Sequence, residues 1–237
     1  MTSFFSVIQT TLMPNLDEQI DQLTDAGVRG LEVYQEKLRQ NARNSLRLLD
    51  LACEGRVALL FSRHSWQVTM RDAPDLALEL DGETLYAEVK HFRRKEQDDL
   101  DEFRMSQATN ELVRIHDVTE TERKNAYAQI AEVARAKDDY QSIGGYPLIL
   151  VIVSSTDCLE LMVETGSASR EYEAVCSAES YPRRLGAIMM INPSVSVRNG
   201  LSNIEFSLID ASVSPLREKH VHALEDIRLD LGSTRPK

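Results

Sequence analysis

Three charged residues at short spacings form the part of this sequence best suited to chemistry. Asp75 follows Pro74 at the start of PDLALELDG, and Glu88 and Lys90 lie two apart in the stretch AEVKH. Two converging carboxylates suit a hard divalent ion such as Mg²⁺, which takes a few carboxylate oxygens and keeps places for water and phosphate oxygens. A lysine beside them could hold a phosphate oxygen, help to deprotonate water and stabilise developing negative charge.

A predicted hairpin brings these three residues together. Asp81-Gly82 stands between two alternating apolar runs, a pattern typical of a two-residue turn. In the resulting register the apolar side chains share one face, while Asp75 lies directly opposite Glu88 on the other and Lys90 follows on that face. Because like charges repel there, we expect a cation, Lys90 or both to offset the repulsion. A three-residue bulged loop would shift this pairing, and an E-x-K on a solvent-facing strand is also ordinary surface chemistry.

Two helices are predicted before the hairpin. The first begins at an N-cap at Asn15 and ends near Gly27. The second spans residues 31–53, where apolar residues recur at helical spacing, and Gly55 stands in the position of a left-handed C-cap. From residue 56 the period changes from about 3.6 to 2. The expected strands are VALLF, SWQVTM, DLALEL and TLYAEVKHF.

Helices and strands alternate after the hairpin. The sequence predicts helices near 97–140, 168–179 and 215–229, and strands at 147–155, 186–192 and 204–210. The order is therefore a helix, three strands, a helix and a strand, followed by an α/β extension. This order implies an α/β fold with a mixed sheet and helices on both of its faces.

Composition narrows the class of protein. A chain of 237 residues can form one large domain, and its net charge of −11 argues against strong non-specific binding to nucleic acid. Local basic clusters could still build a basic cleft on an acidic body. No segment is apolar and long enough to span a membrane, and the three cysteines lack the spacing of a disulfide framework or zinc site, so we expect a cytoplasmic protein.

With these elements the sequence resembles the PD-(D/E)xK phosphodiesterase superfamily, which has the restriction-endonuclease-like fold. The motif carriers are P74-D75 at the start of one strand and E88-V89-K90 on the next. The resemblance covers roughly residues 30–155. It implies a restriction-endonuclease-like core with a mixed central sheet flanked by helices, within a single domain (1–237) that has N-terminal helices and a C-terminal α/β extension (156–237).

The resemblance also implies an activity. Members of this superfamily cut DNA, or in some cases RNA, with Mg²⁺ held by the two acids of the motif. It therefore implies a Mg²⁺-dependent nuclease, with Mn²⁺ as an alternative ion and DNA as the expected substrate. Asp75 and Glu88 become the metal ligands, and Lys90 becomes the catalytic lysine.

Two flanking helices would complete such a site. Many members add a glutamate from the preceding helix, which matches Glu54 here, with Glu36 and Glu32 on the same predicted helix as open alternatives. Some branches use a glutamine or lysine from the helix after the motif. Gln129 is the best match, with Lys124 second and also expected to contact nucleic acid.

A basic cluster follows the motif directly. Arg93, Arg94 and Lys95 could contact phosphates that flank the scissile bond, or they could form a solvated strand exit balanced by the acidic run EQDDLDE. A different function also stays open, namely a catalytically silent member of the same fold that binds nucleic acid or protein. A homodimer is plausible, because cutting both strands of a duplex usually takes two active sites.

Overall fold

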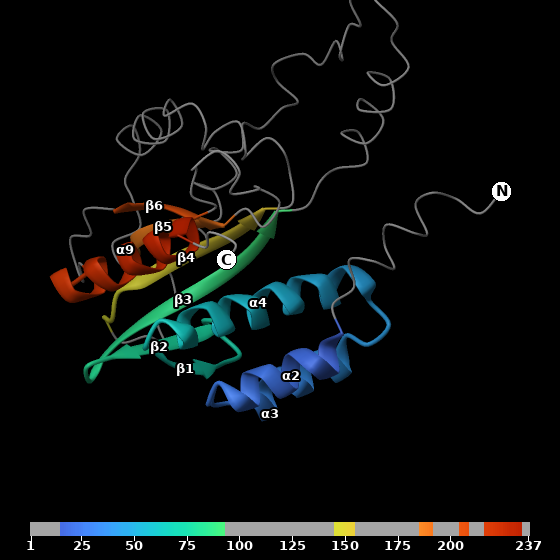
Figure 1. Ribbon diagram of the computed structural model, residues 1–237. Helices are drawn as coiled ribbons and strands as arrows, with labels where there is room; N and C mark the ends of the chain where they lie inside the picture. The colour runs from blue at the N-terminus through green and yellow to red at the C-terminus, as the bar shows by residue number, and fades with distance from the viewer. Residues whose placement is uncertain (1–14, 93–144, 155–184, 192–203, 209–215, 234–237) are drawn as a thin grey trace, which may run out of the picture.

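The protein has a mixed α/β fold around one sheet (Figure 1). The computed structural model describes residues 15–92, 145–154, 185–191, 204–208 and 216–233. The helices within these ranges are α2 (Leu16–Asp25), α3 (Leu31–Gln40), α4 (Ser45–Arg63) and α9 (Glu218–Ser233). The strands are β1 (Gln67–Met70), β2 (Leu76–Leu80), β3 (Glu83–Phe92), β4 (Leu148–Ser154), β5 (Leu185–Ile191) and β6 (Ile204–Leu208).

The six strands form a mixed sheet in the order β1-β2-β3-β4-β5-β6. The first three make an antiparallel meander, β4 and β5 continue in parallel with β3, and β6 returns antiparallel to β5. Residues 148–153 of β4 are buried throughout, which confirms a strand covered on both faces. The predicted mixed sheet is therefore confirmed.

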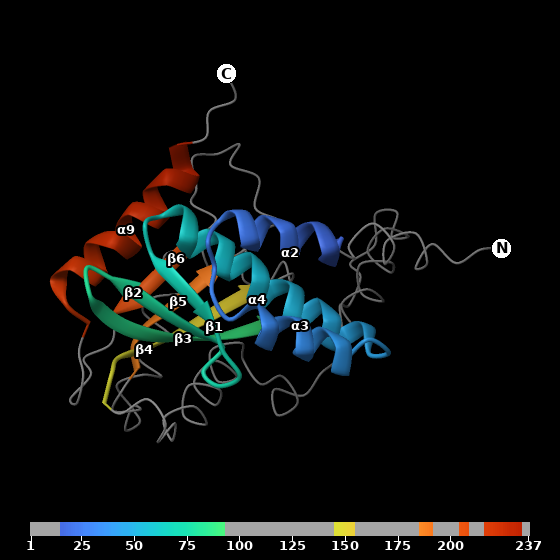
Figure 2. The ribbon, with the colours of Figure 1, turned by 90° about the horizontal axis from the view of Figure 1, so that it is seen from below.

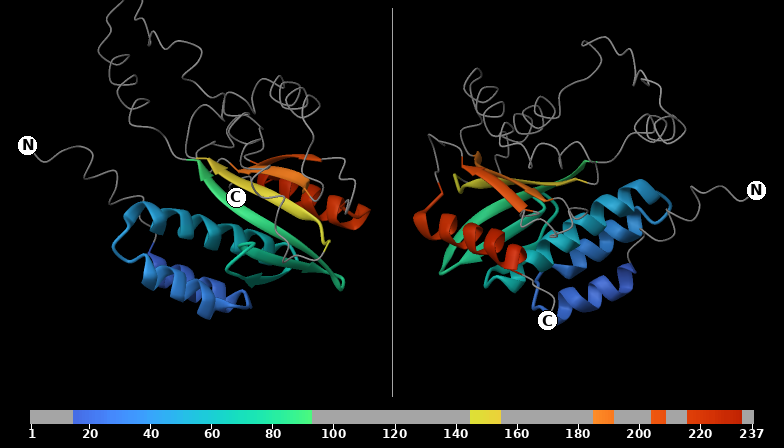
Figure 3. Two further views of the ribbon diagram at one scale, coloured as in Figure 1. Left: turned by 180° about the vertical axis from the view of Figure 1, so that it is seen from behind. Right: turned by 45° about the horizontal axis from the view of Figure 1, so that its top comes forward.

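The four helices within the described ranges lie on one face of this sheet. Apolar residues of α4 and α9 share a single core with the side chains of β1 to β5, and α2 and α3 pack against α4 (Figures 2 and 3). The predicted helices at 97–140 and 168–179 lie outside the described residues, so helices on the second face stay a prediction. None of the helices in the described ranges is long and apolar enough to span a membrane.

The hairpin between β2 and β3 has the predicted turn and register. Asp81 and Gly82 both have positive φ, at 51° and 75°, as a two-residue primed turn requires. The pairs run from Leu80 with Glu83 to Leu76 with Ala87. The alternative bulged loop is therefore not formed, and the apolar side chains of both strands lie in the core as expected.

The prediction for residues 31–61 was wrong in two ways. The single predicted helix is two helices, because the chain breaks after Gln40 and Asn44 caps α4 by accepting a hydrogen bond from the Arg47 N–H. The expected strand VALLF is the second half of α4. That run is buried between the sheet and other helices, so it lacks the one-sided pattern that distinguishes a helix from a strand.

Gly55 is a mid-helix contact residue and not the predicted C-cap. A Cβ added there would lie 2.8 Å from the side chains of Gln19 and Tyr34. These side chains are fixed, because the Tyr34 hydroxyl donates to the Gln19 carbonyl oxygen and the Gln19 amide donates to the Ala52 carbonyl. The absence of a side chain at Gly55 lets α4 approach α2 and α3 closely. The first helix, by contrast, begins at the Asn15 N-cap as predicted.

We predict that Gly55→Ala destabilises the protein. The added methyl group must displace a buried hydrogen-bonded pair, which costs more than the gain in helix propensity, so we expect a net loss of about 1 to 2 kcal/mol. Urea denaturation followed by circular dichroism measures this loss. Arg56→Ala, at the exposed next position of the same helix, should change stability by less than about 0.5 kcal/mol. Equal stabilities of the two variants would contradict the role of Gly55.

Candidate active site

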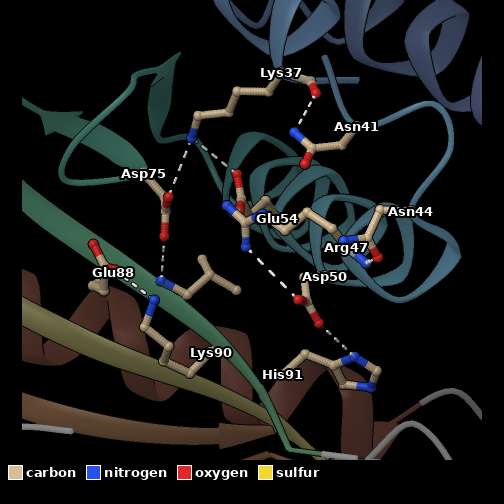
Figure 4. A network of polar contacts seen from close by, with 11 residues as sticks. Lys37, Asn41, Asn44, Arg47, Asp50, Glu54, Asp75, Glu88, Lys90 and His91 are labelled. Carbon is tan, nitrogen blue, oxygen red and sulfur yellow. Dashed lines mark hydrogen bonds and ion pairs between the residues drawn. The ribbon is translucent and has the colours of Figure 1, made fainter. Parts of the chain in front are cut away.

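Four of the predicted site residues meet beside β3. Asp75 directly precedes β2, Glu88 and Lys90 lie on β3, and Glu54 lies in the middle of α4 (Figure 4). The three carboxyl residues are almost fully buried, with exposed fractions of 1% for Glu54, 5% for Asp75 and 3% for Glu88. Buried charges need partners or a bound ion, so the contacts of each carboxylate decide what this cluster can do.

Asp75 lies one residue beyond the β2–β3 ladder, which ends at the pair of Leu76 with Ala87. Its Oδ2 accepts a hydrogen bond of 2.9 Å from the backbone N–H of Val89. The predicted direct pair of Asp75 with Glu88 is thus replaced by a bond to the residue next to Glu88. The two acids still interact electrostatically: burial, and next the charge of Glu88, raises the pKa of Asp75.

Glu88 and Lys90 form an ion pair along one face of β3. The Lys90 Nζ lies 2.7 Å from the Glu88 Oε1. Residues two apart on a strand share a face, so this contact follows from the E-x-K spacing. The Glu88 side chain is buried while the Lys90 side chain is 30% exposed, and the pair therefore reaches from the interior to the surface.

Lys37 is a site residue that the sequence did not reveal. Its Nζ lies 3.1 Å from the Glu54 Oε2 and 3.2 Å from the Asp75 Oδ1, and so bridges the two carboxylates (Figure 4). One signal was available: Tyr34, Lys37 and Leu38 stand at the i, i+3 and i+4 positions of one face of α3. A lysine within a buried stripe needs a buried acid as its partner.

A second series of polar contacts continues from Glu54 along α4. Arg47 lies 3.4 Å from Glu54 and 3.7 Å from Asp50, and Asp50 lies 3.3 Å from the His91 Nδ1 (Figure 4). These contacts reach the last part of β3, and the basic cluster follows in the sequence. Arg47, Asp50 and His91 were not predicted as site residues.

The remaining predicted residues separate into two groups. Glu32 is exposed on α3, and Glu36 of the same helix pairs with Arg39 at 2.7 Å, so Glu54 is the helix glutamate that lies with Asp75. The second group lies outside the described residues and stays a set of predictions: Gln129, Lys124, Arg93, Arg94 and Lys95.

Burial is the main influence on the ionisation of the carboxylates in this cluster. Burial, and next the charge of Asp75, raises the pKa of Glu54 to about 7, although Lys37 and Arg47 oppose the shift. Burial, and next the charge of Glu88, also raises the pKa of Asp75 against the opposing effects of Lys37, the Val89 N–H and Lys90. The carboxylates would therefore gain from further positive charge.

The donor set fits a hard divalent cation in part. In the portion of the chain that the structure describes, no three acidic, histidine or cysteine side chains converge as a full protein cage. Mg²⁺ seldom needs such a cage, since it takes one or two carboxylates together with water and substrate phosphate oxygens. Asp75 and Glu88 supply such carboxylates. Burial, and next the charge of Glu88, raises the pKa of Asp75, and a nearby cation would offset both effects.

No protein-family model, no curated protein and no solved structure matches this chain. The resemblance to the PD-(D/E)xK superfamily therefore stays a prediction from the spacing of Asp75, Glu88 and Lys90 in the sequence.

We predict that Glu54 makes stability depend on pH. Its pKa is higher in the folded chain than its ordinary value of 4.5. The stability that the protonated Glu54 contributes to the folded state is therefore fully present below pH 4.5 and is lost as the pH rises through about 7. The free energy of unfolding should fall over this range by roughly 1 to 3 kcal/mol on account of Glu54. Glu54→Gln should be more stable than the wild type at about pH 8, and its stability should depend less on pH. Some dependence should remain, because Asp75 keeps its own raised pKa.

Urea denaturation in EDTA at several pH values measures these profiles. Glu36→Gln, on the outer surface of α3, is the matched control and should follow the wild type. A Glu54→Gln profile as steep as that of the wild type would show that Glu54 does not cause the dependence.

Proposed function

We propose that this protein is a Mg²⁺-dependent nuclease that hydrolyses phosphodiester bonds, with DNA as its substrate. The observation that carries the proposal is the buried cluster of Glu54, Asp75 and Glu88 with Lys90 beside it. Burying three carboxylates costs several kcal/mol per ion unless positive charge compensates them. A cluster of this kind supports a role in holding a cation, and its motif spacing supports the phosphodiesterase assignment.

Asp75 and Glu88 are the residues that would hold the ion, Mg²⁺ or Mn²⁺. When bound, the ion supplies a more acidic water and polarises a phosphoryl oxygen. The Val89 N–H fixes one oxygen of Asp75, and Lys37 fixes the other, so this carboxylate is oriented before any ligand binds. An ionised carboxylate has about four lone-pair sites, so these two bonds leave acceptor capacity for an ion.

Lys90 has the geometry of a group that acts on substrate. Its ammonium pairs with Glu88, and its side chain is partly exposed to solvent, from which a phosphate could approach. There it can bind a phosphate oxygen, help to deprotonate the attacking water and stabilise charge that develops on the phosphoryl group. With a net charge of −11, attraction for DNA must come from local cations, of which the neighbouring residues 93–95 are candidates.

We also propose a cytoplasmic setting. Cys53 is a buried cysteine in the core, and a buried thiol of this kind is compatible with a reducing compartment. If both strands of a duplex are cut at one place, a homodimer supplies the second active site.

We predict that Lys90→Ala abolishes cleavage without unfolding the protein. Loss of the ammonium should slow hydrolysis by at least about 100-fold. The assay uses plasmid DNA, linear duplex, single-stranded DNA and single-stranded RNA, each with Mg²⁺ and with EDTA. Lys219→Ala is the matched control, because Lys219 is 31% exposed and also pairs with a glutamate, Glu83, at 3.2 Å far from the site. Full activity in Lys90→Ala would reject the assignment, and cleavage of RNA alone would change the substrate.

A second function is favoured by two ion pairs. The Lys37 and Lys90 ammonium groups already lie 3.2 Å from Asp75 and 2.7 Å from Glu88, so lysines could neutralise the acids without a metal ion. The protein would then be a catalytically silent member of this fold that binds nucleic acid or another protein.

Thermal unfolding with added metal separates the two functions. For a metal-dependent nuclease, Mn²⁺ at about 100 times its Kd should stabilise the fold by about 2.7 kcal/mol, because it binds the folded state. Glu88→Gln should remove most of this effect. Glu79→Gln, which alters an exposed acid of β2, should leave it unchanged. Absence of any metal effect in all three proteins would favour the silent function.

A further inference from the structure

A fixed ammonium lies between two of the three buried carboxylates. Lys37 Nζ contacts the Glu54 Oε2 at 3.1 Å and the Asp75 Oδ1 at 3.2 Å, and the side chain of Lys37 is only 12% exposed. Figure 4 shows this lysine entering from α3, on the opposite side of Asp75 from Glu88 and Lys90. Asp75 therefore lies between the Lys37 ammonium on one side and the proposed metal position beside Glu88 on the other.

The lysine is held in place by its own helix. Tyr34 and Leu38 on either side of it are buried in the core, and the Tyr34 hydroxyl lies 2.9 Å from the Leu51 carbonyl oxygen. The Asn41 amide donates to the Lys37 carbonyl at 2.8 Å where α3 ends. These contacts aim the ammonium inward. To leave, it would have to abandon two nearly buried acids, which is strongly unfavourable.

Hydrolysis of phosphodiesters by metal ions can use one ion or two ions about 3.5 to 4 Å apart. A second ion would require its own carboxylates beside the first ion. In this site the carboxylate oxygens that could hold a second ion belong to Glu54 and Asp75, and Lys37 contacts one oxygen of each.

We propose that Lys37 takes the place of a second divalent ion, so that the active site binds a single metal ion at Asp75 and Glu88. This inference rests on the proposed function. Lys37 supplies one positive charge and hydrogen-bond donors but cannot act as a Lewis acid or coordinate water. It is a positioning residue that orients Asp75 and offsets the charge of Glu54. The single metal ion supplies the rest of the positive charge at the site.

The test is the number of Mn²⁺ ions that the full chain binds, measured by isothermal titration calorimetry without nucleic acid. We expect one ion per chain for the wild type. Lys37→Met should bind two, because Glu54 and Asp75 lose the ammonium that occupies their shared position. Arg39→Met, which removes an exposed cation from the same helix, is the matched control and should bind one.

Folding of the variant is tested separately, because Lys37→Met leaves two buried acids without their ammonium. Its melting temperature in EDTA should fall below that of the wild type, and Mn²⁺ should raise it by more than it raises that of the wild type. The double variant Lys37→Met with Glu54→Gln removes both charges of that pair. It should recover stability and bind only one ion, which assigns the second ion to Glu54.

Three outcomes would decide against this inference or against the function beneath it. If the wild type binds two ions, or a folded Lys37→Met variant binds only one, Lys37 does not take the place of a second metal ion. No Mn²⁺ in the wild type would overturn the proposed metal-dependent function. In that case, one ion gained by Lys37→Met would still support Lys37 as a substitute for a cation, and none would overturn it.

Discussion

Three carboxylates share a volume that is nearly closed to water, and the elements around them must supply positive charge there. Moving a carboxylate out of water costs several kcal/mol even after relaxation, and each neighbouring carboxylate adds repulsion. The chain supplies Lys37 from α3, Arg47 from the first turn of α4 and Lys90 from β3. These cations come from three different elements, so the elements must be docked before the acids are compensated.

Close packing of the helices makes this docking possible. Gly55 lets α4 approach Gln19 of α2 and Tyr34 of α3 without a side chain in between. Tyr34 is then buried with its hydroxyl bonded, and this fixes the rotation of α3 about its axis. Lys37 stands three residues further along the same face. The contact of the α4 backbone at Gly55 with the side chains of Gln19 and Tyr34 therefore helps to determine where Lys37 places its positive charge.

Local signals in the sequence were sufficient for the hairpin and for several other elements. The Asp81-Gly82 turn and the alternation of apolar residues fixed the register of β2 and β3, and short β-branched runs located β4 and β5. The run VALLF in the second half of α4 was missed because all five residues are apolar and four of them are buried, so the run itself shows no polar face. Glu54 was placed beside the site by analogy with a helix end, whereas it belongs to the middle of a longer helix. Lys37 was missed because its partners lie 17 and 38 residues away, a distance that no local pattern reports.

The bond from the Val89 N–H to Asp75 joins the architecture of the sheet to the chemistry of the site. The β2–β3 ladder stops at Leu76, while β3 continues to Phe92, so the hairpin opens at Asp75. A side-chain oxygen there accepts a hydrogen bond from β3 just beyond the last pair of the ladder. One carboxylate thus marks the point at which two strands diverge and places an anion in the opening. A change of residue at this position would alter the shape of the hairpin together with the charge of the site, whereas a change at Glu88 or Lys90 would alter the charge and leave the bond between Asp75 and the Val89 N–H in place.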